Sequence, residues 1–210
     1  NMKLWLLSLM MLAIQWSSAQ SLPDELYISG DGKMLLSGKR NSGGFYDSAH
    51  VAEVNLQFSQ SNYWSLLTSN YQSKKEIPAT MTIDGATYAG VGIRFKGNTS
   101  YNMAGNSQKK SFNVSMDFTD TDLEIDGYST LNFNNSFQDP TFLREVLYAR
   151  QIRKYVPALK GNFIHLTLNG VDWGIYPNIQ QVNKDFYKEW FKNNDGINWR
   201  ADKPTGTGGG

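Results

Sequence analysis

Two Xaa-Gly dipeptides between runs of alternating apolar residues constrain the fold of this chain most strongly. Asp84-Gly85 lies between Ala79–Ile83 and Tyr88–Lys96, and Asn169-Gly170 lies between Phe163–Leu168 and Val171–Tyr176. Asp-Gly and Asn-Gly favour two-residue turns with positive φ, which connect neighbouring antiparallel strands. The sequence therefore predicts two β-hairpins and an antiparallel sheet.

Two further segments show the period-two alternation of half-buried strands. They are Val54–Phe58 and Ser111–Phe118. The second would place its apolar side chains on one face: Phe112, Val114, Met116 and Phe118. Between the strands, Tyr63–Thr68 is compatible with a short helix.

A longer helix is predicted after Asp139-Pro140, because Asp is a good N-cap and Pro suits the first helical position. This helix would run from Pro140 to about Tyr155 and end before Pro157. Its packed side would consist of Phe142, Leu143, Val146, Leu147 and Ile152. We expect an α+β fold, in which this helix covers one face of an antiparallel sheet of about five strands.

The first residues are typical of an export signal. A short apolar run, Leu4–Ile14, follows Lys3 and is followed by the small residues Ser17 and Ala19. The run is too short to span a bilayer, so residues 1–19 are expected to be a cleaved signal peptide rather than a transmembrane segment. The alternative is an N-terminal core helix. The chain contains no cysteine, which favours bacterial export over a disulfide-stabilised eukaryotic domain.

The composition restricts the possible partners. The chain has 20 Lys and Arg against 19 Asp and Glu, which gives a net charge of +1. Such a balance indicates neither nucleic acid nor an anionic membrane as a partner, so any anion site must be local. His50 and His165 are solitary in the sequence, and no metal site is proposed from them.

The domain organisation follows from composition along the chain. Residues 20–44 are rich in Gly, Ser and Lys and are expected to be a leader against the domain edge. Residues 45–199 would form one domain. The tail over 200–210 is expected to begin a Gly-rich insertion, with the chain truncated inside a longer protein.

Cations on the predicted strands are the candidates for ligand binding. Arg94 and Lys96 alternate with the apolar residues of their strand, so their face requires an anion or water. Lys110 is in phase with Phe112 and is expected to point toward the covered face, whereas Lys109 points the other way. An inward-facing lysine needs a carboxylate partner or a bound anion.

Three segments, Gly92–Ser100, Lys109–Phe112 and Leu131–Glu145, together resemble the spore-coat protein H (CotH) kinase family over Phe45–Trp199. The resemblance implies the N-lobe of an atypical protein kinase fold in a secreted or surface protein. It also implies transfer of the γ-phosphate of ATP to Ser or Thr of an extracellular protein. The Mg²⁺ ligands and catalytic residues of such a kinase would lie beyond residue 210.

The resemblance also assigns residues to the nucleotide. Glu145, in Phe-Leu-Arg-Glu, would form an ion pair with Lys110 beside the nucleotide. Arg94 and the turn at Asn98 would approach the phosphates. Gln180 stands where the family often has glutamate, and an amide keeps the hydrogen bonds but loses the charge.

Other interpretations remain open. Glu145 could pair with a neighbouring surface cation, and Arg94 could end an ordinary solvated strand. The Asn132, Asn134 and Asn135 cluster is interpreted as structural, because amides satisfy backbone groups in loops. The protein could be a non-catalytic surface or matrix module that keeps the kinase-like fold. The many Trp and Tyr residues also allow a carbohydrate-binding domain, although aromatic residues usually belong to the core.

We expect signal peptidase to cleave between Ala19 and Gln20, because small residues follow the apolar run there. N-terminal sequencing of the exported protein measures this directly. A mature product that still carries Leu4–Ile14 would contradict the prediction.

Overall fold

The computed structural model describes residues 25–28, 35–38, 44–191, 195–197 and 199. The predicted signal peptide and the Gly-rich tail lie outside the described residues. Part of the predicted leader is described as a two-stranded antiparallel sheet, with β1 at Glu25–Ile28 and β2 at Leu35–Gly38.

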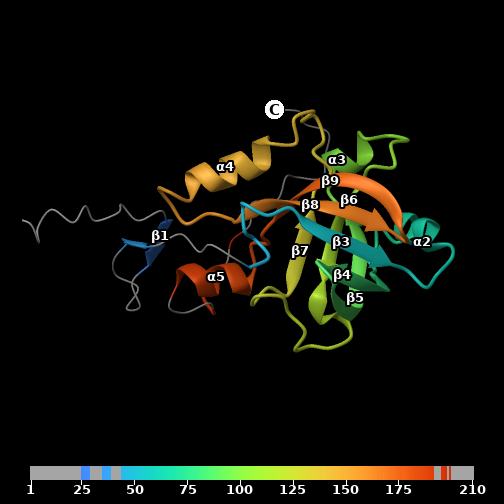
Figure 1. Ribbon diagram of the computed structural model, residues 1–210, viewed down its shortest axis with the longest axis horizontal. Coiled ribbons are helices and arrows are strands. Elements are labelled where there is room, and N and C mark those ends of the chain that lie inside the picture. The colour runs from blue at the N-terminus through green and yellow to red at the C-terminus, as the bar shows by residue number, and fades with distance from the viewer. Residues whose placement is uncertain (1–24, 29–34, 39–43, 192–194, 198, 200–210) are drawn as a thin grey trace, which may run out of the picture.

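Seven strands of the described chain form a closed barrel in the order β3-β4-β5-β6-β7-β9-β8 (Figure 1). Their bounds are β3 Ala52–Gln57, β4 Ile77–Ile83, β5 Ala86–Lys96, β6 Ser111–Ser115, β7 Thr130–Phe133, β8 Gly161–Leu168 and β9 Val171–Ile179. All neighbouring pairs are antiparallel except β3 and β8, which are parallel, with Ala52 opposite Ile164. This one parallel pair closes the barrel.

Both predicted hairpins are confirmed. Asp84 and Gly85 have φ of 47° and 87°, and Asn169 and Gly170 have φ of 48° and 79°, as the predicted turn requires. The turn side chains also anchor β3. Asp84 Oδ1 accepts the N–H of Glu53 at 2.9 Å, and Asn169 Oδ1 accepts the N–H of Phe58 at 2.7 Å.

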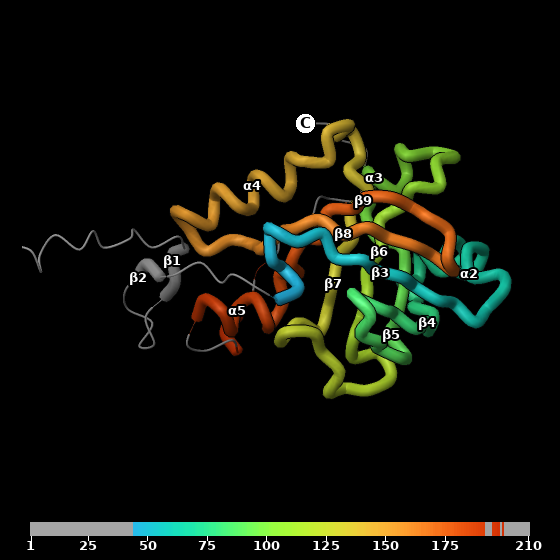
Figure 2. The backbone as a smooth tube through the Cα atoms, viewed as in Figure 1, coloured from blue at the N-terminus to red at the C-terminus, as the bar shows by residue number. Residues whose placement is uncertain are grey.

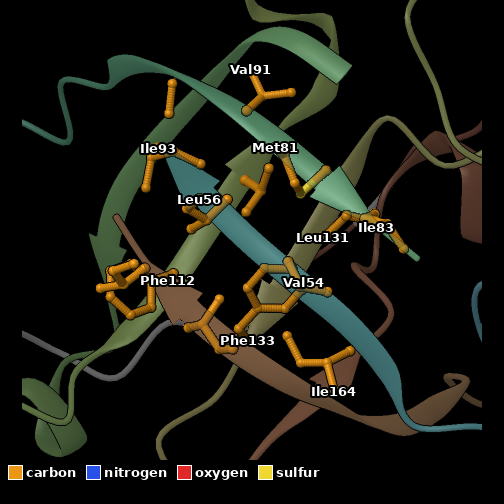
Figure 3. Packing of buried hydrophobic residues seen from close by; sticks show 14 of the residues in the cluster. Val54, Leu56, Met81, Ile83, Val91, Ile93, Phe112, Leu131, Phe133 and Ile164 are labelled. Atoms are coloured by element: carbon orange, nitrogen blue, oxygen red, sulfur yellow. The ribbon is translucent and has the colours of Figure 1, made fainter. Parts of the chain in front are cut away.

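Alternation along the strands fills the barrel with apolar side chains. Figure 3 shows side chains from β3 to β8 directed toward one another inside it, among them Leu56, Met81, Phe112 and Phe133. These four are fully buried. Burial of one such side chain stabilises the fold by about 1.5–3 kcal/mol. Polar residues of the same strands must therefore point outward.

The expected α+β fold, an N-lobe-like antiparallel sheet with a packed helix, is wrong. The strands close into a mixed barrel instead of forming an open sheet. Closure depends on pairing β3 with β8, more than a hundred residues later, and hairpin signals carry no information on such a pair. In addition, β7 was expected to be part of an Asn-rich loop, but Leu131 and Phe133 point into the barrel.

The helices within the described residues are short and lie outside the barrel (Figure 2). They are α2 Tyr63–Ser69, α3 Thr99–Asn102, α4 Arg144–Ile152 and α5 Lys184–Trp190, with a 3₁₀ turn at Met116–Phe118. The short helix expected over Tyr63–Thr68 is confirmed. Strand β6 ends at Ser115, so the expectation that Phe118 belongs to its apolar face is wrong.

Helix α4 differs from its prediction at its start. Asp139 accepts hydrogen bonds from the Thr141 and Arg144 N–H groups and closes a turn in which Phe142 has φ of 62°. The helix therefore begins at Arg144 rather than Pro140. It contacts β8 and β9 and buries Val146 and Ala149, whereas Leu143 and Leu147, expected on the packed side, are exposed.

No helix among the described residues is both long enough and apolar enough to span a membrane.

Candidate functional site

The outward side of β5, β6 and β7 carries a continuous group of polar residues. We call it the polar outer face, and it consists of Arg94, Lys96, Asn113, Asn132 and Asn134. The register places Arg94 opposite Asn113 and Asn113 opposite Asn132. Directly opposite residues have Cβ atoms only about 5 Å apart, so these side chains are close neighbours. The expectation that Arg94 and Lys96 lie away from the apolar side is confirmed.

A lysine, an amide and a carboxylate are linked across this face. Lys96 Nζ donates to Asn134 Oδ1 at 3.1 Å, and Asn134 Nδ2 donates to Glu145 Oε2 at 2.9 Å. The link joins β5 to α4 through the residue that follows β7. Glu145 thus reaches the polar outer face, and its partner there is Asn134 rather than a surface cation.

The surroundings of Lys96 disfavour its charged form, as its lowered pKa indicates. Burial lowers the pKa of Lys96 to about 8, the nearby Glu145 carboxylate opposes this shift, and the Arg94 guanidinium adds to it. Arg94 has its own carboxylate, since its Nε lies 3.7 Å from Glu76 Oε1. Ser115 Oγ donates to the same Glu76 oxygen at 2.6 Å. Two cations therefore share one face, where no described carboxylate forms an ion pair with Lys96.

The asparagine amides order the centre of the face. Asn113 Nδ2 donates to Asn132 Oδ1 at 3.1 Å, and Asn132 Nδ2 donates to Gln181 Oε1 at 2.9 Å. Asn135 has the structural role expected for the cluster, because its side chain donates to the Lys109 and Ser100 carbonyls. Asn134 differs, since it connects two charged side chains.

The predicted ion pair between Lys110 and Glu145 is wrong. Lys110 lies just before β6 and lines the same cavity as the inward-facing Phe95, so its predicted direction is confirmed and only its partner differs. Its Nζ donates to the Tyr101 and Gly105 carbonyls at 3.1 and 3.0 Å, and its side chain is buried. Lys109 reaches the Trp173 and Ile175 carbonyls of β9.

The structure separates the two remaining predicted residues. Asn98 precedes α3, is exposed, and accepts a hydrogen bond from the Asn102 amide at 3.2 Å. Gln180 is only 2% exposed. It accepts the Lys160 N–H and donates to Glu189 Oε2 of α5 at 3.1 Å. Its neighbour Gln181, rather than Gln180, reaches the polar outer face.

A protein-family model described as CotH kinase protein matches residues 93–208, which is more than half of the chain. The chain belongs to the CotH kinase family. A search of curated proteins finds no match. The matched CotH segment begins within β5 and contains every residue of the polar outer face, together with Glu145. The strands β3 and β4 precede it.

Sequence reasoning did not assign Lys96 to the nucleotide, and it did not identify Asn113, Asn134 or Gln181 as site residues. The alternation in β5 did place Lys96 on a face that needs an anion or water. The link from Lys96 through Asn134 to Glu145 has no sequence signal, because it depends on how α4 packs beside the barrel.

Removal of the partly desolvated Lys96 charge should change how the stability of the fold depends on pH. Lys96 has a pKa of about 8 in the folded chain against 10.5 ordinarily, so between these values the unfolded chain binds more protons. Stability must then rise with pH across this window. Lys96→Met removes this rise. Between pH 7 and 10.5, the free energy of unfolding of the wild type should therefore increase by on the order of 3 kcal/mol relative to that of the variant.

Urea unfolding at a series of pH values measures this difference. Lys75→Met, at an exposed lysine, controls for loss of one positive charge. If the free energy of unfolding depended on pH in the same way for the wild type and Lys96→Met, the Lys96 ammonium would not be desolvated in the folded chain, contrary to the prediction.

Proposed function

We propose that the polar outer face holds the phosphate groups of ATP. The chain would then be the nucleotide-binding part of a secreted CotH-like kinase that transfers the γ-phosphate to Ser or Thr of an extracellular or surface protein. The observation that carries the proposal is the Lys96–Asn134–Glu145 link, with Arg94 on the same face. Membership of the CotH kinase family supports it.

The physical argument rests on unbalanced charge. Phosphoryl transfer needs positioning and charge neutralisation more than covalent participation by the protein. A partly desolvated cation without an ion pair is unfavourable, and a phosphate beside Lys96 would supply the missing negative charge. Arg94 lies two residues away on the same face of β5, a separation of about 7 Å. The two cations can therefore contact neighbouring phosphates.

The remaining residues would position these cations. Glu145 and Asn134 would hold the Lys96 ammonium, and Glu76 would hold Arg94. The turn after β5 would bring backbone N–H groups and the exposed Asn98 amide to the phosphates. Gly97 has φ of 96°, and a Cβ there would collide with the Ser100 hydroxyl, so this close turn needs glycine.

Lys110 and Gln180 would support the site indirectly. Lys110 fixes the carbonyls of Tyr101 and Gly105 in the loop after Asn98. Gln180 fastens the segment after β9 to Glu189 of α5. Neither side chain needs to contact the nucleotide for the face to bind it.

Mg²⁺ would neutralise phosphate charge when it binds together with ATP. The described residues include no group of three or more His, Cys, Asp or Glu side chains that could hold a metal ion. These residues therefore do not fit a complete metal site, and the proposal takes no step through the metal. It also assigns no catalytic residue within this chain.

A second function is a secreted surface or matrix module that keeps the fold without catalysis. The observation that favours it is Gln180, whose amide is engaged at both ends within the protein and carries no charge. Binding of ATP separates the two functions, because a module of this kind has no requirement for nucleotide.

Calorimetric titration of ATP into the chain, with and without Mg²⁺, tests the proposal. Arg94→Gln and Lys96→Met should each weaken binding at least about tenfold, since each removes a charge-assisted hydrogen bond. Lys75→Met, at an exposed lysine, should leave affinity unchanged. Thermal melting checks that the variants fold. Absence of ATP binding in the wild type, or wild-type affinity in Lys96→Met, would contradict the proposal.

A further inference from the structure

A cavity of about 360 Å³ lies between α2, β5 and the loop that follows α3. Its aromatic wall is formed by Trp64, Phe95 and Tyr101. Phe95 belongs to the inward side of β5, whereas its neighbour Lys96 belongs to the polar outer face. The cavity is therefore on a different side of β5 from the proposed phosphate site, and its size is at the lower end for small-molecule sites.

Contacts between rings fix the aromatic wall. The ring centroids of Trp64 and Phe95 are 4.9 Å apart, and those of Phe95 and Tyr101 are 5.8 Å apart. Tyr101 stacks on Tyr71 at 3.5 Å, and the Tyr71 hydroxyl donates to the Gly97 carbonyl at 2.7 Å. These contacts with neighbouring side chains and with the Gly97 carbonyl fix the rings, so the aromatic wall does not need a ligand to order it.

The rest of the lining is more polar. It comes from the loop between α3 and β6 and includes the amide side chains of Asn106 and Gln108, both of which are exposed. Amides can donate and accept hydrogen bonds together, which suits hydroxyl groups. A ligand for this cavity would thus have an apolar face toward the rings and hydroxyls toward the loop.

Lys110 adds a positive charge to the same cavity. Its side chain is 8% exposed, and its Nζ donates to the carbonyls of Tyr101 and Gly105. Lys110 forms no ion pair with any carboxylate among the described residues. Two of the three ammonium N–H groups reach these carbonyls, and Nζ also lies 4.7 Å from the centre of the Tyr101 ring, so all of these partners of Lys110 are uncharged. A buried cation without a counter-charge favours a negatively charged ligand.

We propose that this cavity binds an acidic monosaccharide unit, such as a hexuronic acid. The sugar ring would lie against Trp64, its hydroxyls would contact Asn106 and Gln108, and its carboxylate would bind Lys110. This inference concerns a second site and does not depend on the proposed nucleotide function.

A calorimetric titration of the chain with glucuronate tests whether the cavity binds an acidic sugar. Glucuronate should bind at least about fivefold more tightly than glucose, because only glucuronate supplies the charge-assisted hydrogen bond. Acetate, which has the charge without the ring, should bind no better than glucose. Glucuronate should also raise the melting temperature of the wild type.

Two variants locate the binding. Lys110→Met should weaken glucuronate binding about tenfold and leave the weak binding of glucose unchanged. Because Lys110 also holds its loop, Asn106→Ala provides a variant that disturbs no described contact of the barrel. It should weaken both sugars about threefold to fivefold without changing ATP affinity.

Several results would overturn the proposal. They are no glucuronate binding by the wild type, equal binding of acetate and glucuronate, or competition between glucuronate and ATP. Wild-type glucuronate affinity in a folded Lys110→Met protein would do the same. Failure of the ATP titration alone would leave the sugar-acid site standing, so the two proposals fail separately.

Discussion

The parallel pairing of β3 with β8 is the constraint on which the rest of this structure depends. It closes seven strands into a barrel, with Val54 opposite Leu166 and Leu56 opposite Leu168, all four fully buried. A closed barrel leaves no unpaired strand edge and fixes which side chains face inward. Without this pair, β3 and β8 would be the two edges of an open sheet, and the apolar side of β5 would need another cover.

Closure also explains why charge collects where it does. Phe95, Phe112 and Phe133 of three adjacent strands fill the interior. The residues next to each of them along its own strand are therefore directed outward. Arg94 and Lys96 thereby meet an asparagine-rich surface, and α4 brings Glu145 to its edge. The carboxylate reaches the lysine through the Asn134 amide and not directly. This arrangement leaves the charge of Lys96 partly desolvated and only partly balanced, which is the basis of the proposal that an anionic ligand binds there.

Local features of the fold could be predicted from the sequence, and long-range ones could not. Asp84-Gly85 and Asn169-Gly170 define their hairpins because turn geometry depends on two residues. Alternation in β5 placed Arg94 and Lys96 correctly. Closure of the barrel, by contrast, depends on a pair more than a hundred residues apart. Lys110 is buried on the side of Phe95, as its phase with Phe112 predicted, but its partners are the Tyr101 and Gly105 carbonyls instead of Glu145. Glu145 was identified, but its partner depends on the packing of α4, which begins later than Pro140 because Asp139 closes a separate turn.

Mapping of ATP binding by NMR tests most directly the central claim that the polar outer face is the nucleotide site. The side-chain amide of Asn134 and the backbone amides of Lys96, Gly97 and Asn98 report on that face, and the indole N–H of Trp64 reports on the cavity behind β5. The expected result is that ATP shifts the Asn134 and Lys96–Asn98 signals most and leaves the Trp64 signal nearly unchanged. Shifts concentrated at Trp64 and in the loop before Lys110, with the Asn134 amide unaffected, would contradict the account.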